Sequence, residues 1–303
     1  MAFDPKLPFR ARDALAAGLT RRALASPRFR KLLPGVYIDA TVKVTPRILA
    51  PAALLLLPRD GFASHHLAAR VYGGIVPHAE VLHVSVPEHR NRSRKQGLFV
   101  HRSAHRPTSF AGVRLTTATD TFVDLAGHPG LVDLVVLGDS LVKKQRTTPA
   151  ALVAAAASAP VRVRKHAQRA AALVRARVDS PMETRVRLLL VLAGLPEPEV
   201  DIRFWHDNGD LRRRIDLGYR EARLGIEYDG RHHVTVVGQW ENDIMRREEF
   251  ENEEWRLVTL VSKDIHRTPA DTLLRVVAAM RARGMEVPPL RDEWRAYFRE
   301  VPA

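Results

Sequence analysis

The chain has 303 residues, 46% of them hydrophobic, which is enough for two or three packed domains. It contains no cysteine, which excludes disulfides and thiolate metal sites. The longest apolar run, Ile48 to Leu57, contains Pro51 and is too short to cross a bilayer. Because the first residues also lack a secretory signal, we expect a cytoplasmic protein with no membrane partner.

Charge is divided unevenly along the chain. Residues 1–178 carry 28 Lys/Arg and 10 Asp/Glu, a net charge of +18, whereas residues 179–303 carry 20 and 24, a net charge of −4. A basic region of this size favours contact with a polyanion, most simply nucleic acid. The alternative is that the many arginines and alanines reflect only a GC-rich genome.

Residues 1–50 predict a winged-helix-like domain. A helix rich in arginine is followed by a basic strand from Arg28 to Leu32, a Pro34-Gly35 turn and a second strand from Val36 to Ile38. In this arrangement the basic side chains would contact phosphates, and the alternative is a solvated hairpin. The candidate nucleic-acid residues are Arg21, Arg22, Arg28, Arg30 and Lys31.

Residues 51–140 predict a small mixed α/β domain. Ser64 is placed to cap an alanine-rich helix that begins with the pair His65-His66. This pair could suggest a metal site, but no Cys, Asp or Glu stands at ligand spacing, so we expect packing or capping. The stretch 87–97 is predicted to be a hairpin tip that contacts phosphate, or simply an exposed turn, and its candidate residues are Arg90, Arg92, Arg94 and Lys95.

Four segments in this region, in order, carry a resemblance: RFRKLLPGVYID, FASHHLAARVYGG, VLHVSVPEHRNRSRKQGLFVHRS and GVRLTTATDTFVDLAG. Over about residues 10–145 the chain resembles AbiEi-type antitoxin-like proteins. The resemblance implies a winged helix before a small mixed domain. It also implies binding to promoter DNA and a toxin-type protein partner.

Residues 141–178 are predicted to form a basic helical connector. From Ser140 to Val178 the chain has nine Lys/Arg and no acidic residue. Thr148-Pro149 is typical of a helix start, Pro160 ends that helix, and a second helix follows.

Residues 179–303 predict a separate domain with the order α-β-β-β-α-β-α. Its first helix begins with a capping box formed by Ser180, Pro181 and Glu183. An Asn-Gly turn within 207–210 joins the first two strands, and the second helix is expected over ENDIMRREEFENEE. The whole chain is therefore expected to be a multi-domain α/β (α+β) protein.

Three carboxylates are predicted to lie across two adjacent strands of this domain. Asp216, Glu227 and Asp229 alternate with apolar residues, so they fall on the face opposite to those residues. Like charges across a ladder repel and raise a carboxyl pKa unless a cation lies between them. Mg²⁺ or Mn²⁺, which prefer oxygen ligands, would supply that cation. The alternative is a charged strand face paired with arginines such as Arg213, Arg214 and Arg223.

The same residues carry a second resemblance. The segments SPMETR, RRIDLGY and IEYDGRHH, then Asp243 and Arg247, then WRLVTLVSKDI, resemble the Vsr-like branch of PD-(D/E)xK endonucleases over about residues 179–284. The resemblance implies a restriction-endonuclease-like core with metal ligands Asp216, Glu227 and Asp229. The catalytic set that it implies is Glu183, Asp216, Glu227, Asp229, His232, His233 and Arg247.

We therefore expect a DNA-binding, Mg²⁺- or Mn²⁺-dependent endonuclease that hydrolyses phosphodiester bonds in repair or defence. Asp229 stands where the common core of these nucleases has a lysine. The alternative is a non-catalytic DNA-binding regulator, antitoxin-like, that carries a degenerate nuclease fold. An RNA-binding structural protein is disfavoured, because the chain has no RNP-type aromatic motif.

Overall fold

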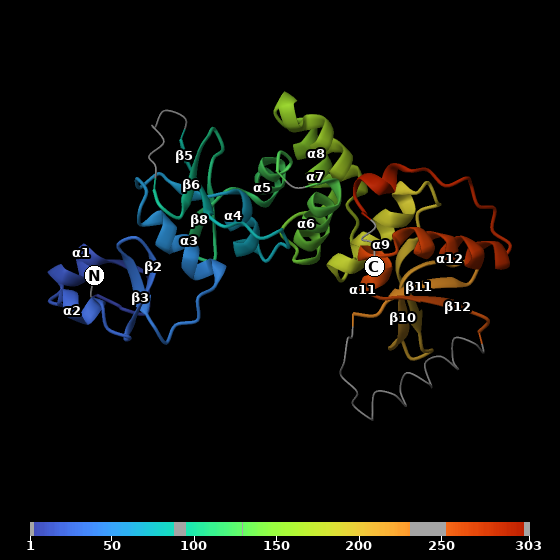
Figure 1. Ribbon diagram of the computed structural model, residues 1–303, viewed down its shortest axis with the longest axis horizontal. Coiled ribbons are helices and arrows are strands. Elements are labelled where there is room, and N and C mark those ends of the chain that lie inside the picture. Colours follow the sequence, from blue (N-terminus) through green and yellow to red (C-terminus); the bar gives the residue numbers. More distant parts are fainter. Residues whose placement is uncertain (1–2, 88–94, 129, 231–252, 300–303) are drawn as a thin grey trace. The chain divides into compact units, whose positions relative to one another are not determined.

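The computed structural model describes residues 3–87, 95–128, 130–230 and 253–299 (Figure 1). The chain is a mixed α/β protein with three sheets, and it divides into two compact units. The first unit comprises residues 1–129 and 144–173, and the second comprises 130–143 and 174–303. No helix in the described part of the chain has the length and hydropathy needed to cross a bilayer.

The first unit begins with a small three-stranded sheet of order β1-β3-β2. The side chain of Thr20 caps the short second helix by accepting a hydrogen bond from the backbone N–H of Ala23 (3.1 Å). Phe9, Ala14, Leu24 and Phe29 form the core between helices and sheet. The predicted basic strand and turn are confirmed. The elements are β1 (Phe9–Arg10), α1 (Ala11–Ala16), α2 (Arg21–Leu24), β2 (Phe29–Leu33) and β3 (Val36–Asp39).

A five-stranded sheet of order β6-β5-β4-β8-β7 follows in the same unit. Helices α3 and α4 pack against it, and α5 packs on α4, so the sheet is covered by short helices. The elements are α3 (Pro46–Leu54), β4 (Phe62–Ala63), α4 (His65–Tyr72), β5 (Leu82–Pro87), β6 (Leu98–Ser103), β7 (Thr108–Phe110), β8 (Val113–Leu115) and α5 (Ala118–Leu125).

The predicted hairpin between β5 and β6 is wrong. The two strands pair in parallel, with Leu82 beside Leu98 and Pro87 beside Ser103. A hairpin joins antiparallel neighbours, so a parallel pair of strands excludes a hairpin here. Side-chain alternation is the same in both arrangements, so the sequence pattern does not determine strand direction.

Two helices predicted in the basic connector are confirmed, but they belong to the first unit. Thr148 caps α7 (Pro149–Ala157) by accepting from the N–H of Ala151 (3.2 Å), and α8 (Val161–Leu173) packs on α7. The preceding helix, α6 (Leu131–Lys143), belongs to the second unit. This exchange of helices between the units was not anticipated from the sequence.

The second unit contains a four-stranded sheet of order β12-β11-β10-β9. Strands β9, β10 and β11 pair antiparallel and β12 joins in parallel, while α9 and α12 lie together beside the sheet (Figure 1). The helix predicted over 241–254 falls almost wholly outside the described residues. The elements are α9 (Pro181–Leu192), β9 (Glu199–Trp205), β10 (Leu211–Tyr219), β11 (Leu224–Tyr228), β12 (Arg256–Leu260), α11 (Ser262–His266), α12 (Pro269–Ala282) and η1 (Glu293–Ala296).

A buried ion pair joins α9 to α6 inside the second unit. Nη2 of Arg187 lies 3.0 Å from Oδ2 of Asp139, and the two side chains are 0% and 2% exposed. The same carboxylate accepts hydrogen bonds from the Thr184 hydroxyl and the Arg175 backbone N–H, each at 2.8 Å. The second guanidinium nitrogen, Nη1, contacts Glu197 at 3.0 Å. Burial is tolerated because every charge has a partner.

This ion pair predicts an asymmetric response to two substitutions on α6. Asp139→Ala leaves the Arg187 guanidinium buried with less compensation, and we expect the second unit to lose about 3–5 kcal/mol of stability. Asp133 is a matched control, because it pairs with Arg185 of the same helix α9 at 2.6 Å but is 31% exposed. Asp133→Ala is expected to cost about 1 kcal/mol or less.

Urea unfolding followed by tryptophan fluorescence measures both variants. All four tryptophans lie at positions 205–294 of the sequence, so the signal reports the second unit. Equal losses in the two variants would show that burial of the ion pair has no special weight.

Candidate functional site

Four predicted carboxylates belong to elements that meet in the second unit. Glu183 lies in the first turn of α9, Asp216 lies on β10, Glu227 lies on β11, and Asp229 follows β11 directly. Helix α9 packs against both strands. The predicted residues His232, His233 and Arg247, and also Asp243, lie outside the described residues.

Glu183 acts as a helix cap and also lies beside another carboxylate. Its backbone N–H donates to Oγ of Ser180 (3.1 Å), and its Oε2 accepts from the backbone N–H of Asp179 (2.8 Å). Ser180 is therefore confirmed as the N-cap, but Glu183 does not close the predicted capping box, because its carboxylate accepts from the N–H of Asp179 and not from that of Ser180. Burial raises the pKa of Glu183, and the negative charge of Asp216 raises this pKa as well, although the Asp179 hydrogen bond lowers it.

Asp216 is held by one backbone group and one arginine. The backbone N–H of Tyr228 donates to Oδ2 of Asp216 (3.2 Å), and Nη2 of Arg214 lies 3.7 Å from Oδ1. Arg214 also pairs with Asp179, which Lys143 contacts at 3.0 Å. One arginine thus contacts two carboxylates, Asp179 and Asp216.

The strand register places Asp216 and Glu227 in neighbouring positions. The β10–β11 ladder pairs Leu217 with Ile226, so the next step of the same register sets Asp216 against Glu227. All three strand carboxylates are partly exposed. Asp229 is fixed at the strand end by its backbone N–H, which donates to the carbonyl of Leu260 (2.8 Å).

The alternative of arginine pairing is confirmed for Asp216. Arg214 contacts Asp216, whereas Arg213 pairs with Glu253 and Arg223 pairs with Glu254. Arg213 is therefore engaged by an acid from outside the predicted site.

The predicted nucleic-acid residues of the first unit lie on its surface. Two are in α2 and three are in or next to β2, and all five side chains are exposed: Arg21, Arg22, Arg28, Arg30 and Lys31. Lys95 is also exposed, immediately before β6. Arg90, Arg92 and Arg94 lie outside the described residues.

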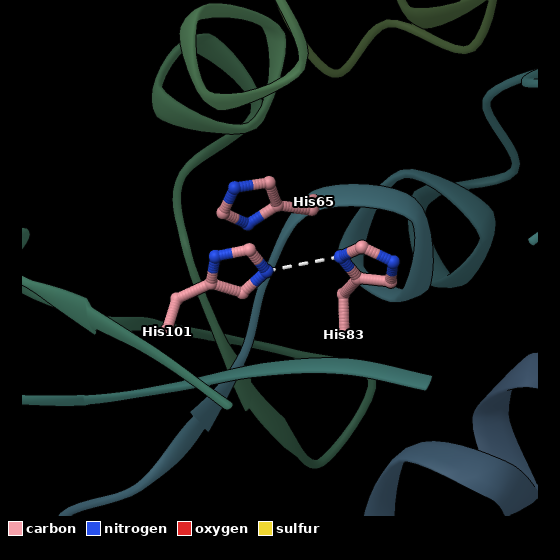
Figure 2. Close-up of side chains that lie close together, drawn as sticks. All are labelled: His65, His83 and His101. Carbon is pink, nitrogen blue, oxygen red and sulfur yellow. Dashed lines mark hydrogen bonds between the residues drawn. The ribbon is translucent and has the colours of Figure 1, made fainter. Parts of the chain in front are cut away.

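A group of histidines in the first unit was missed by the sequence analysis. His65 at the start of α4, His83 on β5 and His101 on β6 turn their rings toward one another (Figure 2). Nδ1 of His83 and Nε2 of His101 share a hydrogen bond of 2.9 Å. The rings of His65 and His101 stack with centroids 3.7 Å apart and planes 11° from parallel.

Possible ligand atoms of these three histidines lie within 4.8 Å of one another. Among the described residues, these three histidines form a group of possible metal ligands at this spacing. Asp216, Glu227 and Asp229 do not form such a group. His66 and His128 complete the surroundings, with ring centroids 4.8 Å from His83 and 5.6 Å from His65 respectively.

Burial favours the neutral form of two rings in this group. Burial, together with the neighbouring histidines, lowers the pKa of His65 to about 2. Burial also lowers the pKa of His83 to about 4. His65 has a φ of 49°, a left-handed conformation that typically costs a non-glycine residue about 1–3 kcal/mol. The fold therefore holds this ring in place against a local backbone preference.

The comparisons name no activity. No family model matches the sequence. Two uncharacterized proteins from two strains of Mycobacterium tuberculosis are similar to this chain, each 29% identical over 108 residues. The match covers 35% of this chain and 40% of the length of each relative.

The environment of Glu183 predicts that its ionised form destabilises the second unit. A carboxyl whose pKa is raised by folding binds its proton more tightly in the folded state, so the free energy of unfolding decreases as pH rises above the ordinary value of 4.5. Glu183→Gln keeps an acceptor for the Asp179 N–H and removes the charge. We expect a higher urea midpoint than wild type at pH 7.5, with the gain vanishing at pH 4.

The matched control is Glu221→Gln, because Glu221 is exposed on the turn between β10 and β11. Its midpoint is expected to stay at the wild-type value at both pH values. A Glu183→Gln variant that is less stable than wild type at pH 7.5 would refute the idea that the carboxylate is destabilising.

Proposed function

We propose that this protein is a Mg²⁺- or Mn²⁺-dependent endodeoxyribonuclease. In this proposal the first unit docks on DNA and the second unit hydrolyses a phosphodiester bond. The observation that carries it is the meeting of Glu183, from α9, with Asp216, from β10, on the strand face that also holds Glu227. Carboxylates that a fold brings together despite their repulsion are typical of sites that bind a cation.

The donor atoms of this site fit a hard cation. Mg²⁺ is usually held by one or two carboxylates and keeps several waters, so Asp216 with Glu227 would be sufficient. Asp229 is a further oxygen donor at the end of the same strand. When bound, the ion would polarise the scissile phosphate and lower the pKa of an attacking water.

The chain's own residues would position and assist this chemistry. The Tyr228 N–H and Arg214 orient the Asp216 carboxylate, which keeps its oxygens in place. In this proposal Glu183, whose pKa burial raises, accepts or returns the proton. Roles for His232, His233 and Arg247 remain part of the proposal.

DNA docking is assigned to the basic surface of α2 and β2. In a winged-helix arrangement, Arg21 and Arg22 would face one part of the duplex and the strand residues another. Exposed Arg and Lys side chains supply the phosphate contacts that fix a protein on DNA without reading its sequence.

Asp229 supports one rival function. It replaces the lysine of the common nuclease core, which favours a DNA-binding regulator, antitoxin-like and with a toxin-type partner, that has lost cleavage. The two functions differ in whether DNA is cut when Mg²⁺ is added.

We expect Asp216→Asn to reduce nicking of supercoiled DNA in Mg²⁺ by roughly a hundredfold or more, since metal stabilisation is worth several kcal/mol. Asp210→Asn is the matched control. It makes the same chemical change at an exposed residue, on the turn before β10. It should cut at the wild-type rate. DNA binding without cleavage in the wild type, in both Mg²⁺ and Mn²⁺, would select the rival function.

We expect the triple substitution Arg28→Ala, Arg30→Ala and Lys31→Ala to weaken DNA binding and to lower the slope of log affinity against log salt by about 2–3. A triple change on α8, at the exposed residues Arg162, Lys165 and Arg169, removes the same charge and serves as the control. Fluorescence anisotropy over a salt series measures both. Equal losses from the two triples would indicate a diffuse charge effect instead of a docking surface.

A further inference from the structure

We propose that His65, His83 and His101 bind a transition-metal dication of the Zn²⁺ class. The three residues come from separate elements of the first unit, and their possible ligand atoms lie within 4.8 Å of one another (Figure 2). Imidazole nitrogen suits Zn²⁺, Co²⁺, Ni²⁺ and Cu²⁺, whereas Mg²⁺ prefers oxygen. This site therefore belongs to the first unit and differs in its chemistry from the acidic site of the second unit.

The contact between His83 and His101 shows that a ring lone pair is present in the group. A metal ligand must be a neutral imidazole. The 2.9 Å hydrogen bond between Nδ1 of His83 and Nε2 of His101 needs a lone pair on one of these two nitrogens.

A carboxylate lies behind the histidine group. Oδ2 of Asp124 is 3.7 Å from Nδ1 of His65, and Oδ1 of Asp124 is 3.0 Å from Nε2 of His105. Metal-binding histidines commonly have a carboxylate partner that orients the ring. Ser64 adds a second orienting contact, because its Oγ lies 3.1 Å from Nδ1 of His65 and also accepts from Ser85.

Two buried polar atoms at the edge of this group lack a hydrogen-bond partner among the described residues. They are Nδ1 of His66 and Oδ2 of Asp124. Buried polar atoms are normally satisfied, so two orphans beside one cluster need an explanation. An ion that pulls the rings together would bring the ring of His65 closer to Asp124.

Binding requires one movement that the geometry defines. The stacked rings of His65 and His101 lie in nearly parallel planes, and one ion cannot lie in both planes at once. His101 is only partly buried, so its ring has room to turn away from the stack. This turn breaks its hydrogen bond to His83 and frees both nitrogens as ligands.

The test is metal uptake by the full-length chain, without an affinity tag and after removal of bound metal with a chelator. Zn²⁺ is measured by equilibrium dialysis with elemental analysis, and Co²⁺ is measured by its visible ligand-field absorption. We expect one Zn²⁺ or Co²⁺ per wild-type chain. His83→Gln and His101→Gln should each weaken binding by roughly 100-fold or more, and Asp124→Asn by about 10–100-fold.

His78→Gln is the matched control, because His78 is an exposed histidine of the same unit that contacts none of the cluster rings in the described structure. It should bind like wild type. Wild-type chain that takes up no Zn²⁺ or Co²⁺ overturns the proposal, as does a His101→Gln variant that keeps wild-type affinity. His101 is partly exposed, so we expect the His101→Gln variant to fold. Circular dichroism verifies its fold.

Discussion

The buried pair between Arg187 and Asp139 is the constraint on which the second unit depends. Two charges removed from water are tolerable only in fixed geometry, so α6 and α9 are held at one relative position. Glu183 lies one turn before Arg187 on the same helix. The position of Glu183 relative to α6 is therefore set by an ion pair outside the candidate acidic site. The Asp139 carboxylate adds bonds to Thr184 and Arg175, which leaves α9 little freedom to rotate.

Features with a local cause were predictable from the sequence. The N-cap at Ser180, the Asn-Gly turn and the strand around Asp216 each arise from interactions within a few residues. The partners of distant segments were not predictable in the same way. Strand direction between β5 and β6 leaves no trace in side-chain alternation, and the histidines that it brings together are far apart in the sequence. The sequence next to His65 does lack acids and cysteines at ligand spacing. The histidines that contact His65 come from strands β5 and β6, which are distant in the sequence.

The candidate acidic site and the histidine group differ in the way the protein handles charge. At the acidic site, burial raises the pKa of Glu183, the charge of Asp216 raises this pKa as well, and Arg214 lies 3.7 Å from Asp216. In the histidine group, burial lowers the pKa of His65 and of His83, which favours the neutral form of these two rings. Carboxylates suit a hard cation that prefers oxygen ligands and keeps bound water. Imidazoles suit a transition metal that binds nitrogen.

The exchange of helices between the two units has a consequence for how the chain matures. Because α6 belongs to the second unit and α7 and α8 to the first, neither unit is one continuous stretch of polypeptide. During synthesis, α6 is made before α9, the helix against which it packs. At that stage the first unit still lacks α7 and α8. The apolar surface of α6 is thus exposed until residues beyond 181 have been made. A ribosome that pauses between residues 143 and 181 would leave α6 accessible to chaperones. A truncation between α6 and α7 would remove part of both units.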